Sequence, residues 1–432
     1  MDRMEKVVAL CKRRGFIFQS SEIYGGVSGL YDYGPYGVAL KRSIRELWWR
    51  HTVDLRDDVV GLESTILMHP SVWEASGHVE NFVDPLRQCE GECKRRWRGD
   101  HVEGDRCPQC GGHLGEVRQF NLMFRTNLGP VEDAGSAAYL RPETAQGMFV
   151  DFRNVLNSMR VRVPFGIAQQ GRSFRNEITP GNFVFRLREF EQMEMEYFVR
   201  PGDDERWFEH WKQERMHWYT DVLGIKPENL RFRDHGTDER AHYAKASTDI
   251  EYVFPFGWSE LEGIASRTDF DLRAHQEHSG QDLSYLDPET NDRYLPWVIE
   301  PAVGVDRILI ACLLDAYDED QVKGETRVVV RFSSNIAPVQ VAVMPLSKKE
   351  ELITPAREVL GLVRQHFRVE YDQTGGNIGK RYRRQDEIGT PFCVTIDFDT
   401  INDRAVTIRE RDSMEQARVP ITELVEQLKS RQ

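Results

Sequence analysis

Hydrophobic residues recur with regular periods along the chain and predict its main helices and strands. From Tyr36 to about Arg56, leucine, isoleucine and tryptophan return every three or four positions, which predicts an amphipathic helix, and Pro35 suits its start. The next residues, VVGLESTILMHP, are typical of a strand that Pro70 ends. The segment VIEPAVGVDRILIACLLDAY, Val298–Tyr317, predicts a strand that enters a buried helix through a glycine turn.

Strand-like runs also flank a Thr-Pro-Gly-Asn turn in SFRNEITPGNFVFRLREFEQMEMEYF, Ser173–Phe198. The segment is therefore predicted to be a β-hairpin. Side chains alternate between the faces of a strand, which places Arg175 and Glu177 together on the first strand. On the second strand, one face carries Arg186, Arg188, Phe190, Gln192, Glu194 and Glu196. The hairpin thus presents arginines at one end and carboxylates at the other.

The last segment of the chain changes character at the Asn335–Pro338 junction. VQVAVMPL, CVTIDFD and AVTIRER alternate as strands, and apolar residues at helical spacing mark helices between and after them. Residues 336–432 are therefore predicted to form a self-contained α/β domain that follows a larger domain of residues 1–335. Within the larger domain, Asp203–Val222 indicates an amphipathic helix, and residues 199–248 are predicted as a helical insertion.

Composition places the chain among ordinary globular proteins. With 432 residues, 40% hydrophobic and 29% charged, it is long enough for two or three domains. No apolar run is long enough to span a bilayer, and the N-terminal MDRMEKVVALCKRRGFIF is typical of an amphipathic helix rather than a secretory signal. We therefore expect a cytoplasmic protein. The net charge of −13 disfavours non-specific nucleic-acid binding but is compatible with a local basic surface.

Four of the seven cysteines lie close together and predict a metal site. They are Cys89, Cys93, Cys107 and Cys110. Their spacing, C-x3-C, 13 residues and C-x2-C, suits one tetrahedral Zn²⁺ ion. His101 and His113 are possible substitutes, and a set of free thiols on a surface insertion is the alternative interpretation. We predict a structural zinc ion that holds together an insertion, residues 84–118, with no core of its own.

The arginines and carboxylates of the hairpin have counterparts further along the chain. Glu300, a turn at Gly304 and Arg307 open an otherwise apolar helix, where an arginine opposes the helix macrodipole. A salt-bridge ladder on a solvated sheet face would explain the hairpin but not this arginine. Several arginines near carboxylates are what a polyphosphate with Mg²⁺ requires. The pattern favours a nucleoside triphosphate site on an unusual platform, because GGNIGKR lacks P-loop spacing and no G-x-G-x-x-G follows a strand.

These segments resemble the three motifs of class II aminoacyl-tRNA synthetases. The hairpin's F-R-x-E and the R-x-x-x-F at Arg186–Phe190 resemble motif 2, and GVDR at 304–307 resembles motif 3. The Tyr36 helix, the following strand and Pro70 resemble motif 1, the dimerisation element. More narrowly, the chain resembles homodimeric glycyl-tRNA synthetases in the segments YDYGPYG, SGH, YLRPETAQG, FRNEITPGNF, REFEQMEMEYF, ELEGIASRTDFDL, VIEP and YRRQDEIGTPFCVTIDFDT.

The resemblance implies an α+β fold. The catalytic domain, residues 1–335, would be a six- or seven-stranded antiparallel sheet flanked by helices and would carry the zinc-bearing insertion at 84–118. Residues 336–432 would be a mixed α/β anticodon-binding domain. The family's partners would then be glycine, ATP, tRNA(Gly) and a second copy of the chain as a homodimer, with no membrane.

The resemblance further implies how ATP is held. Arg175 would bind the α-phosphate, and Phe190 and Arg307 would enclose the adenine, with Arg307 also near the γ-phosphate. Glu177 and Arg186 would contact the adenine and the phosphates. Of these residues, Arg175, Arg307 and Glu177 would carry catalysis, in which glycine's carboxylate attacks the α-phosphate without a protein nucleophile.

Carboxylates would serve the metal and the amino acid. Glu262 and Glu300 would bind Mg²⁺, and Glu143 and Glu194 would bind the ammonium group of glycine, with Glu300 and Arg175 adjoining it. Selection for glycine would come from steric exclusion of any side chain, and no editing domain would be needed. Many members carry a serine where this chain has Ala302, which puts that one hydroxyl contact in doubt.

In the C-terminal domain, a cluster of basic residues would contact tRNA phosphates beside a stacking ring, Tyr382. The basic residues are Lys380, Arg381, Arg383 and Arg384. A solvated charged face is the alternative for this cluster. Two rivals to the ligase also stand: a non-catalytic nucleic-acid-binding relative, which would be expected to lose ATP-site residues, and an adenylating enzyme that loads another acceptor.

Overall fold

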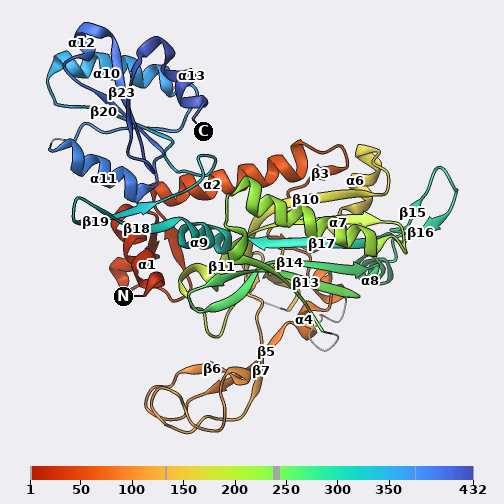
Figure 1. Ribbon diagram of the computed structural model, residues 1–432. Coiled ribbons are helices and arrows are strands. Elements are labelled where there is room, and N and C mark those ends of the chain that lie inside the picture. The colour runs from red at the N-terminus through yellow and green to blue at the C-terminus, as the bar shows by residue number, and fades with distance from the viewer. Residues whose placement is uncertain (1, 132–133, 237–243, 375, 432) are drawn as a thin grey trace.

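The computed structural model describes residues 2–131, 134–236, 244–374 and 376–431. Figure 1 shows a large domain built around a central sheet, a small lobe that projects below it, and a C-terminal domain at the upper left. Among the described residues, no helix combines the length and the apolar character needed to cross a membrane.

The central sheet has seven strands in the order β12-β13-β14-β17-β11-β10-β3. Neighbouring strands are antiparallel, except that β3 pairs in parallel with β10. The predicted antiparallel sheet is thereby confirmed, with one parallel edge strand added. The strands are β3 (Val59–Gly61), β10 (Phe165–Phe174), β11 (Glu189–Val199), β12 (Leu230–Asp234), β13 (Ala246–Phe254), β14 (Gly257–Thr268) and β17 (Trp297–Gly304).

Helices cover the two faces of this sheet, and alternation along β11 shows which side chains meet them. On one face Tyr197 packs 5.1 Å from the Trp211 ring of α7, and on the other Phe198 packs 4.6 Å from Phe152 of α6. The first face is covered by α2 (Pro35–Trp49), α7 (Asp204–His217) and α9 (Val305–Ala316). The second face is bordered by α5 (Ala145–Val150), α6 (Phe152–Met159) and α8 (Phe270–Ser279). Each face has its own apolar core.

The predicted hairpin is present, but its strands are shorter than expected. β10 ends at Phe174 and β11 begins at Glu189, so residues 175–188 form a long connection with a short 3₁₀ turn at Phe183–Phe185. Pro180 has no N–H to donate to a ladder, and only an isolated bridge joins Gly181 to Arg186. The four charged residues predicted near the turn therefore lie in this connection and not in strands; they are Arg175, Glu177, Arg186 and Arg188.

Two other predicted elements differ from the structure. The single strand expected after the Tyr36 helix is split into β3 and β4 (Leu67–Met68). In the described part of the range 199–248, the helical elements are α7, a π-helical turn at Trp218–Val222 and a 3₁₀ turn at Pro227–Asn229, after which β12 joins the central sheet. The sequence LRFRD of β12 alternates apolar and charged residues, a strand signal that the helical interpretation overlooked. Residues 237–243 of this range lie outside the described residues.

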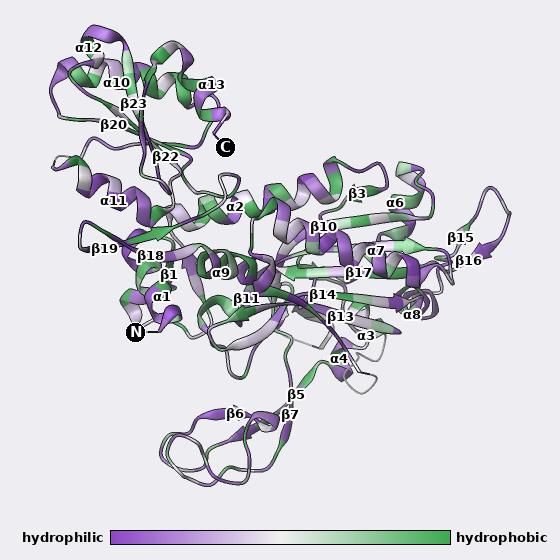
Figure 2. Ribbon diagram, viewed as in Figure 1, coloured by the Kyte–Doolittle hydropathy of each residue, from purple (hydrophilic) through white to green (hydrophobic). Residues whose placement is uncertain are grey.

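The projecting lobe is a three-stranded sheet in the order β6-β5-β7. Figure 2 colours β6 and β7 largely hydrophilic, and the buried core of the lobe consists of Cys89, Cys107 and Leu114. So small a core cannot hold the lobe together alone. The strands are β5 (Val83–Gln88), β6 (Arg96–Arg98) and β7 (Arg118–Asn121).

The C-terminal domain is a five-stranded mixed sheet with helices, as predicted. The strand order is β21-β20-β22-β23-β24, with β20 parallel to β21 and β22. Its strands are β20 (Val341–Pro345), β21 (Val369–Tyr371), β22 (Phe392–Ile396), β23 (Ala405–Glu410) and β24 (Gln416–Pro420). Its helices are α10 (Glu350–Val363), α11 (Ile378–Ile388), α12 (Thr400–Asp403) and α13 (Leu424–Lys429).

Short elements complete the large domain. The helices are α1 (Arg3–Arg14), α3 (Pro70–Ala75) and α4 (His78–Asn81). The strands are β1 (Ile17–Gln19), β2 (Tyr31–Tyr33), β8 (Arg125–Asn127), β9 (Ala137–Leu140), β15 (Tyr285–Leu286), β16 (Arg293–Tyr294), β18 (Tyr317–Val322) and β19 (Glu325–Val330). The β18–β19 hairpin lies beside α11 of the C-terminal domain (Figure 1).

Candidate active site and metal centre

A cavity of about 520 Å³ lies on the sheet face opposite α7 and α9. Strands β11, β14 and β17 form its floor, and the connection between β10 and β11 forms part of its wall. The structure brings together here all nine residues predicted to bind ATP or glycine. They are Glu143, Arg175, Glu177, Arg186, Phe190, Glu194, Glu300, Ala302 and Arg307.

Within the described residues, the arginine end of the cavity has two guanidinium groups that form no ion pair. Arg175 donates from Nε to the Pro142 carbonyl oxygen at 3.0 Å, and its guanidinium lies 5.4 Å from the Phe82 ring and 5.3 Å from the Phe190 ring. Among the described ion pairs none involves Arg175 or Arg186. Two positive groups at the cavity wall that form no ion pair among the described residues are suited to an anionic ligand.

Arg307 occupies the first turn of α9 and has a different environment. Its Nη1 lies 3.0 Å from Glu260 Oε2, and its guanidinium lies 4.5 Å from the ring of Phe185. The charge of Arg307 lowers the pKa of Glu260 from its usual value. Phe185, which sequence reasoning missed, is therefore the ring beside Arg307, whereas Phe190 faces Arg175. Both rings line the cavity.

The carboxylate end is buried and crowded. Glu194 accepts hydrogen bonds from the Thr144 N–H at 3.1 Å and from the Thr144 hydroxyl. Burial, reinforced by the negative charges of Glu300 and Glu143, raises the pKa of Glu194 to about 8. Glu300 accepts from Arg267 Nη1 at 2.6 Å, and burial still raises its pKa to about 7.

Two neighbouring acids complete this end. Burial opposes ionisation of Glu143, but His78, whose Nε2 lies 3.3 Å away, and Arg267 hold the pKa of Glu143 well below its usual range. Glu196 is buried, and its oxygens accept no hydrogen bond among the described residues. Oxygen atoms of Glu194, Glu196 and Glu300 lie within 4.8 Å of one another. Among the described residues this cluster has more acids than cationic partners, since Arg267 pairs with Glu300 alone of the three, and it is suited to an added cation.

The structure corrects the assignment of Glu262 as a magnesium ligand. Glu262 is 1% exposed and lies on the opposite face of the sheet, where Arg215 donates to it at 2.6 Å and Tyr219 at 2.6 Å. A β-bulge shifts the register of β14, so that Ile250 pairs with Glu262 and the next residue of β13 pairs with Glu260. The extra residue turns Glu260 toward the cavity and Glu262 away from it.

The four predicted cysteines converge at the tip of the lobe. Their Sγ atoms lie within 4.8 Å of one another, with separations of 3.5 Å for Cys89–Cys110, 3.6 Å for Cys93–Cys107 and 3.3 Å for Cys93–Cys110. Tetrahedral Zn²⁺ coordination requires about 3.8 Å between sulfurs, so the set fits zinc after small adjustments. Neither His101 nor His113 belongs to this group; His113 instead contacts Glu90 at 3.1 Å.

The basic cluster on α11 is only partly available to a ligand. Lys380 is exposed, and Arg384 contacts the Thr374 hydroxyl at 3.2 Å. Arg381 is 3% exposed and donates to Asp372 at 3.2 Å and to the Pro345 carbonyl oxygen at 2.8 Å, so its predicted phosphate contact is wrong. The Tyr382 hydroxyl bonds Thr395 at 2.6 Å and its ring packs on the domain core, so it is not a free stacking ring.

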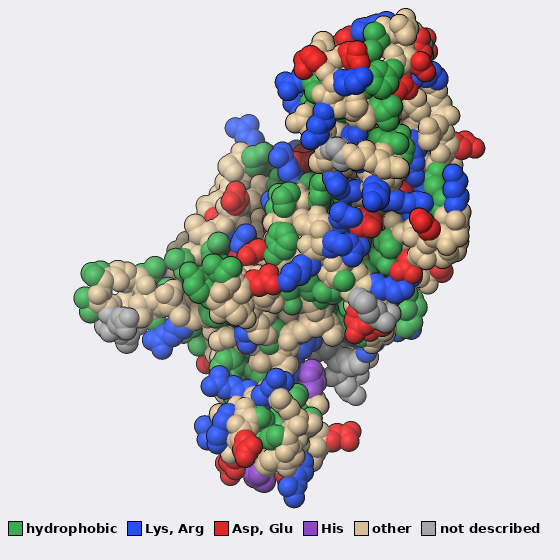
Figure 3. Space-filling view, turned by 90° about the vertical axis from the view of Figure 1, so that its left-hand side faces the viewer, with side chains coloured by type: hydrophobic (Ala, Val, Ile, Leu, Met, Phe, Trp, Pro, Cys, Tyr) green, Lys and Arg blue, Asp and Glu red, His purple; other side chains and the backbone are tan. Residues whose placement is uncertain are grey.

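The spacing of residues along α11 indicates that Arg381 is buried. Arg381, Gln385 and Ile388 follow one another at i, i+4 and i+7 and all face the sheet. Arg383 lies 3.6 Å from Asp386 and is half-buried. Figure 3 shows lysine and arginine side chains gathered on this side of the molecule, between the C-terminal domain at the top and the large domain below.

Comparisons with known proteins agree with this arrangement. Residues 124–317 match the family described as tRNA synthetase class II core domain (G, H, P, S and T), and residues 340–431 match the family described as anticodon binding domain. A glycine–tRNA ligase of Treponema denticola is 52% identical, covering 99% of this chain and 96% of the relative. A glycine–tRNA ligase of Caldanaerobacter subterraneus is 54% identical, with 98% and 96% covered.

Among solved structures, a prolyl-tRNA synthetase from Cryptosporidium parvum, complexed with halofuginone and AMPPNP, superposes with a TM-score of 0.68 at 16% identity. The match covers 98% of this chain and 74% of that one, and it supports the fold. Sequence identity above one half along nearly the whole chain is the stronger finding. The chain belongs to the glycine–tRNA ligase family of class II aminoacyl-tRNA synthetases.

Proposed function

We propose that this chain activates glycine with ATP to glycyl-adenylate and pyrophosphate, and then transfers the glycyl group to the 3′ end of tRNA(Gly). One observation carries the proposal: a single cavity joins arginines, two of which form no ion pair among the described residues, to a buried cluster with more carboxyl groups than cationic partners. The first feature suits the phosphates of ATP, and the second suits the ammonium group of an amino acid.

Activation would need no protein nucleophile. Arg175 and Arg186 would hold the phosphates so that glycine's carboxylate attacks the α-phosphate in line, and Arg175 would stabilise the charge that develops there. Arg307, backed by Phe185, would cover one face of the adenine, with Phe190 toward the other. Mg²⁺, when bound, would neutralise phosphate charge, and Glu260 replaces Glu262 as the cavity-lining acid that could reach it.

Specificity for glycine would follow from the floor of the cavity. Ala302 of β17 pairs with Glu194 of β11 on one side and with Gly263 of β14 on the other. Ala302 therefore lies directly beside the acid proposed to bind the ammonium group. Alanine removes a hydroxyl there but keeps a Cβ that occupies the space a substrate side chain would need, so exclusion of larger amino acids is retained.

Binding of the amino acid should release protons from this cluster. At pH 7, pKa values of about 8 for Glu194 and about 7 for Glu300 keep both groups partly protonated. An added ammonium favours the ionised acids and lowers both pKa values. The negative charges of Glu143, Glu196 and Asp271 act in the opposite direction and raise these pKa values, whereas the positive charge of Arg267 lowers them. Calorimetry of a non-hydrolysable glycyl-adenylate analogue, in pH 7 buffers of different ionisation enthalpy, should show release of about one proton. Proton uptake would contradict the role of these acids.

Cys89, Cys93, Cys107 and Cys110 would hold a structural zinc ion that supplies the lobe with the stability its small core lacks. Close packing supports this, since a Cβ at Gly112 would lie 3.2 Å from Cys89 Sγ and 3.3 Å from Cys110 Sγ. A side chain at that position would crowd the sulfurs.

Replacing Cys107 with serine should release the metal and make the lobe sensitive to proteolysis. The measurement is zinc content by atomic absorption together with limited trypsin digestion. Cys393→Ser, which alters a buried thiol of the C-terminal domain, should retain zinc. A metal-free wild type purified without chelators would end the zinc assignment.

The remaining partners follow from the fold. Lys380, Arg383 and Arg384 of α11 would contact tRNA phosphates. We also propose a homodimer through α2 and β3, the segments that resemble the dimerisation motif; β3 is one of the two outer strands of the described central sheet and so has an edge open for pairing. A cytoplasmic location would suit these partners.

The first experiment is amino-acid-dependent ATP–pyrophosphate exchange with glycine, alanine, serine or no amino acid. Exchange with glycine alone would establish the activation step and its specificity. No exchange with any of them in a folded protein would favour a non-catalytic nucleic-acid-binding relative. Glycine-dependent exchange without charging of tRNA, unaffected by deletion of residues 336–432, would indicate an adenylating enzyme with another acceptor.

A further inference from the structure

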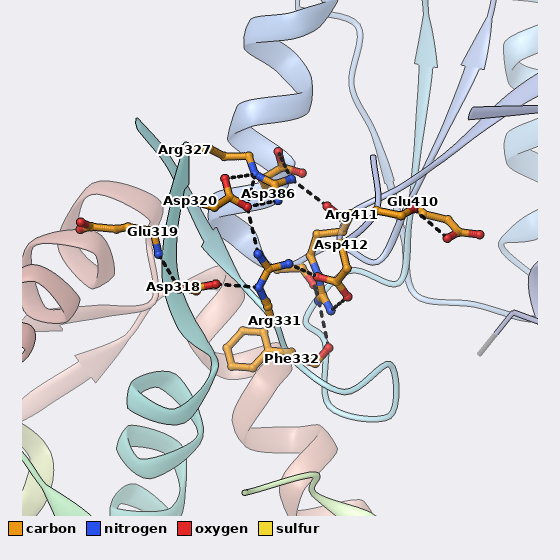
Figure 4. A network of polar contacts seen from close by, with 12 residues as sticks. Asp318, Glu319, Asp320, Arg327, Arg331, Phe332, Asp386, Glu410, Arg411 and Asp412 are labelled. Carbon is orange, nitrogen blue, oxygen red and sulfur yellow. Dashed lines mark hydrogen bonds and ion pairs between the residues drawn. The ribbon is translucent and has the colours of Figure 1, made fainter. Parts of the chain in front are cut away.

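A network of charged side chains, buried at its centre, joins the C-terminal domain to the β18–β19 hairpin of the large domain (Figure 4). At its centre Arg327 of β19 is 1% exposed. Its Nε donates to Asp320 of β18 at 2.8 Å, and its Nη1 donates to the Arg411 carbonyl oxygen at 2.8 Å and lies 3.5 Å from Asp386 Oδ2. Asp386 belongs to α11 and Arg411 follows β23, so one arginine contacts two elements of the C-terminal domain.

The charged groups that the C-terminal domain contributes to this junction also have hydrogen-bond partners. Asp386 has no exposed surface, and Arg409 of β23 donates to both of its carboxylate oxygens at 2.8 and 3.0 Å. Arg411 donates to the carbonyl oxygens of Phe332 at 2.9 Å and Gly389 at 3.0 Å. Phe332 lies in the linker between the domains and Gly389 ends α11, so Arg411 fastens the linker to the helix.

Further contacts fix the same helix end. Arg331, at the start of the linker, reaches Asp318 at 3.0 Å and Asp320 at 2.9 Å in β18, and Asp412 at 2.7 Å in the C-terminal domain. The linker passes so close to α11 that a Cβ on Gly389 would lie 2.5 Å from the Phe332 ring. Glu387, two residues before Gly389, pairs with Arg14 of α1 at 2.6 Å.

Such a junction fixes the relative orientation of the two domains more than it adds to their stability. Domains joined by a polar interface are expected to move relative to one another. Buried ion pairs add little net stability, because desolvation offsets their attraction. A buried charge that loses its partners is nevertheless strongly destabilising, so the pairs favour the one arrangement that keeps all partners together. The clamped helix is also the one whose other surface presents Lys380 and Arg384 outward. Its orientation therefore sets where the proposed tRNA contacts lie relative to the cavity.

We propose that Arg327, Asp386 and Arg411 are positioning residues for the tRNA step. They hold the C-terminal domain in the orientation in which a tRNA bound along α11 delivers its 3′ end to the cavity. The inference rests on the proposed function. None of the three residues lines the cavity, so glycine activation does not depend on them. A variant that loses aminoacylation but keeps glycine activation has therefore lost the positioning role and not its fold.

Arg327→Met tests the proposal with the full-length chain. The variant leaves Asp386 paired with Arg409 and Asp320 paired with Arg331, so neither carboxylate loses its last arginine. We expect KM for tRNA(Gly) in aminoacylation to rise at least tenfold while glycine-dependent ATP–pyrophosphate exchange stays within twofold of wild type. Arg327→Lys should recover part of the loss. Arg404→Met, which removes an exposed pair with Glu358 at 3.0 Å within the C-terminal domain, should leave KM for tRNA unchanged.

Arg331→Met provides a second, more exposed position should Arg327→Met fail to fold. It should raise KM for tRNA at least threefold with unchanged exchange, and small-angle X-ray scattering should show a broader distance distribution. Exchange that falls together with aminoacylation, or aminoacylation that is normal in both variants, would overturn the inference alone. A wild type without glycine-dependent exchange would overturn the proposed function and this inference with it.

Discussion

Replacing Arg175 with alanine should reduce glycine-dependent ATP–pyrophosphate exchange by about three orders of magnitude. The guanidinium lies at the cavity wall between the Phe82 and Phe190 rings and is held by the Pro142 carbonyl oxygen. It is thus oriented before any ligand binds, so no reorganisation accompanies the charge that develops on the α-phosphate. Removing one such preorganised charged donor costs about 4 kcal/mol of transition-state stabilisation, which equals this factor. The measurement is the exchange rate at saturating glycine and ATP.

Arg172→Ala is the matched control. Arg172 lies three residues earlier in β10, is largely exposed and pairs with Glu189 outside the cavity. Exposed ion pairs contribute little, so exchange should stay within about twofold of wild type. Melting temperatures near wild type in both variants would show that folding is intact. Normal exchange in Arg175→Ala would remove the α-phosphate assignment.

Arg175 also shows how far the sequence alone leads. Its place in a motif, with Glu177, Arg186 and Phe190 nearby, was enough to predict that these side chains share a site. Their secondary structure was not predictable in the same way, because strand alternation continues in the sequence past Phe174 and Glu189, where the paired strands end. The charged residues reach the cavity from a connection that no local pattern distinguishes from a strand.

Glu262 was assigned to Mg²⁺ from the family resemblance, and the local sequence could not have corrected it. Period-two alternation would put Glu260 and Glu262 on one face, and only the bulge in β14, set by pairing with β13, separates them. Pairing between strands is a tertiary property with no signature in one segment. Arg381 was misplaced because its buried partner, Asp372, lies before α11 in the sequence. The run of basic residues is typical of an exposed surface, and only the packing of α11 on its sheet shows that Arg381 is buried.

Replacing Glu194 with glutamine should raise KM for glycine roughly 100-fold, because a charge-assisted hydrogen bond to the substrate ammonium becomes a weaker neutral one. The side chain keeps its size and its contact with Thr144, so kcat at saturating glycine should fall less than kcat/KM. The matched control is Glu191→Gln. Glu191 lies on the opposite face of the same strand, where it pairs with Lys41 at 3.2 Å and Arg45 at 3.0 Å. KM for glycine should stay within about twofold in this control.

The same Glu194→Gln substitution should stabilise the ligand-free protein by an amount that depends on pH. A stabilised variant would exclude misfolding as the cause of its lost activity. Burial raises the pKa of Glu194 from 4.5 to about 8, so the folded state binds more protons than the unfolded state between these values. Wild-type stability from this group is therefore fully present below about pH 4.5 and is lost as the pH rises through about 8. Glutamine does not titrate, so its melting temperature should exceed that of wild type increasingly from pH 5 to pH 8.5. A variant that is less stable than wild type at pH 8.5 would contradict the raised pKa of Glu194. Unchanged KM for glycine would show that Glu194 does not hold the ammonium group.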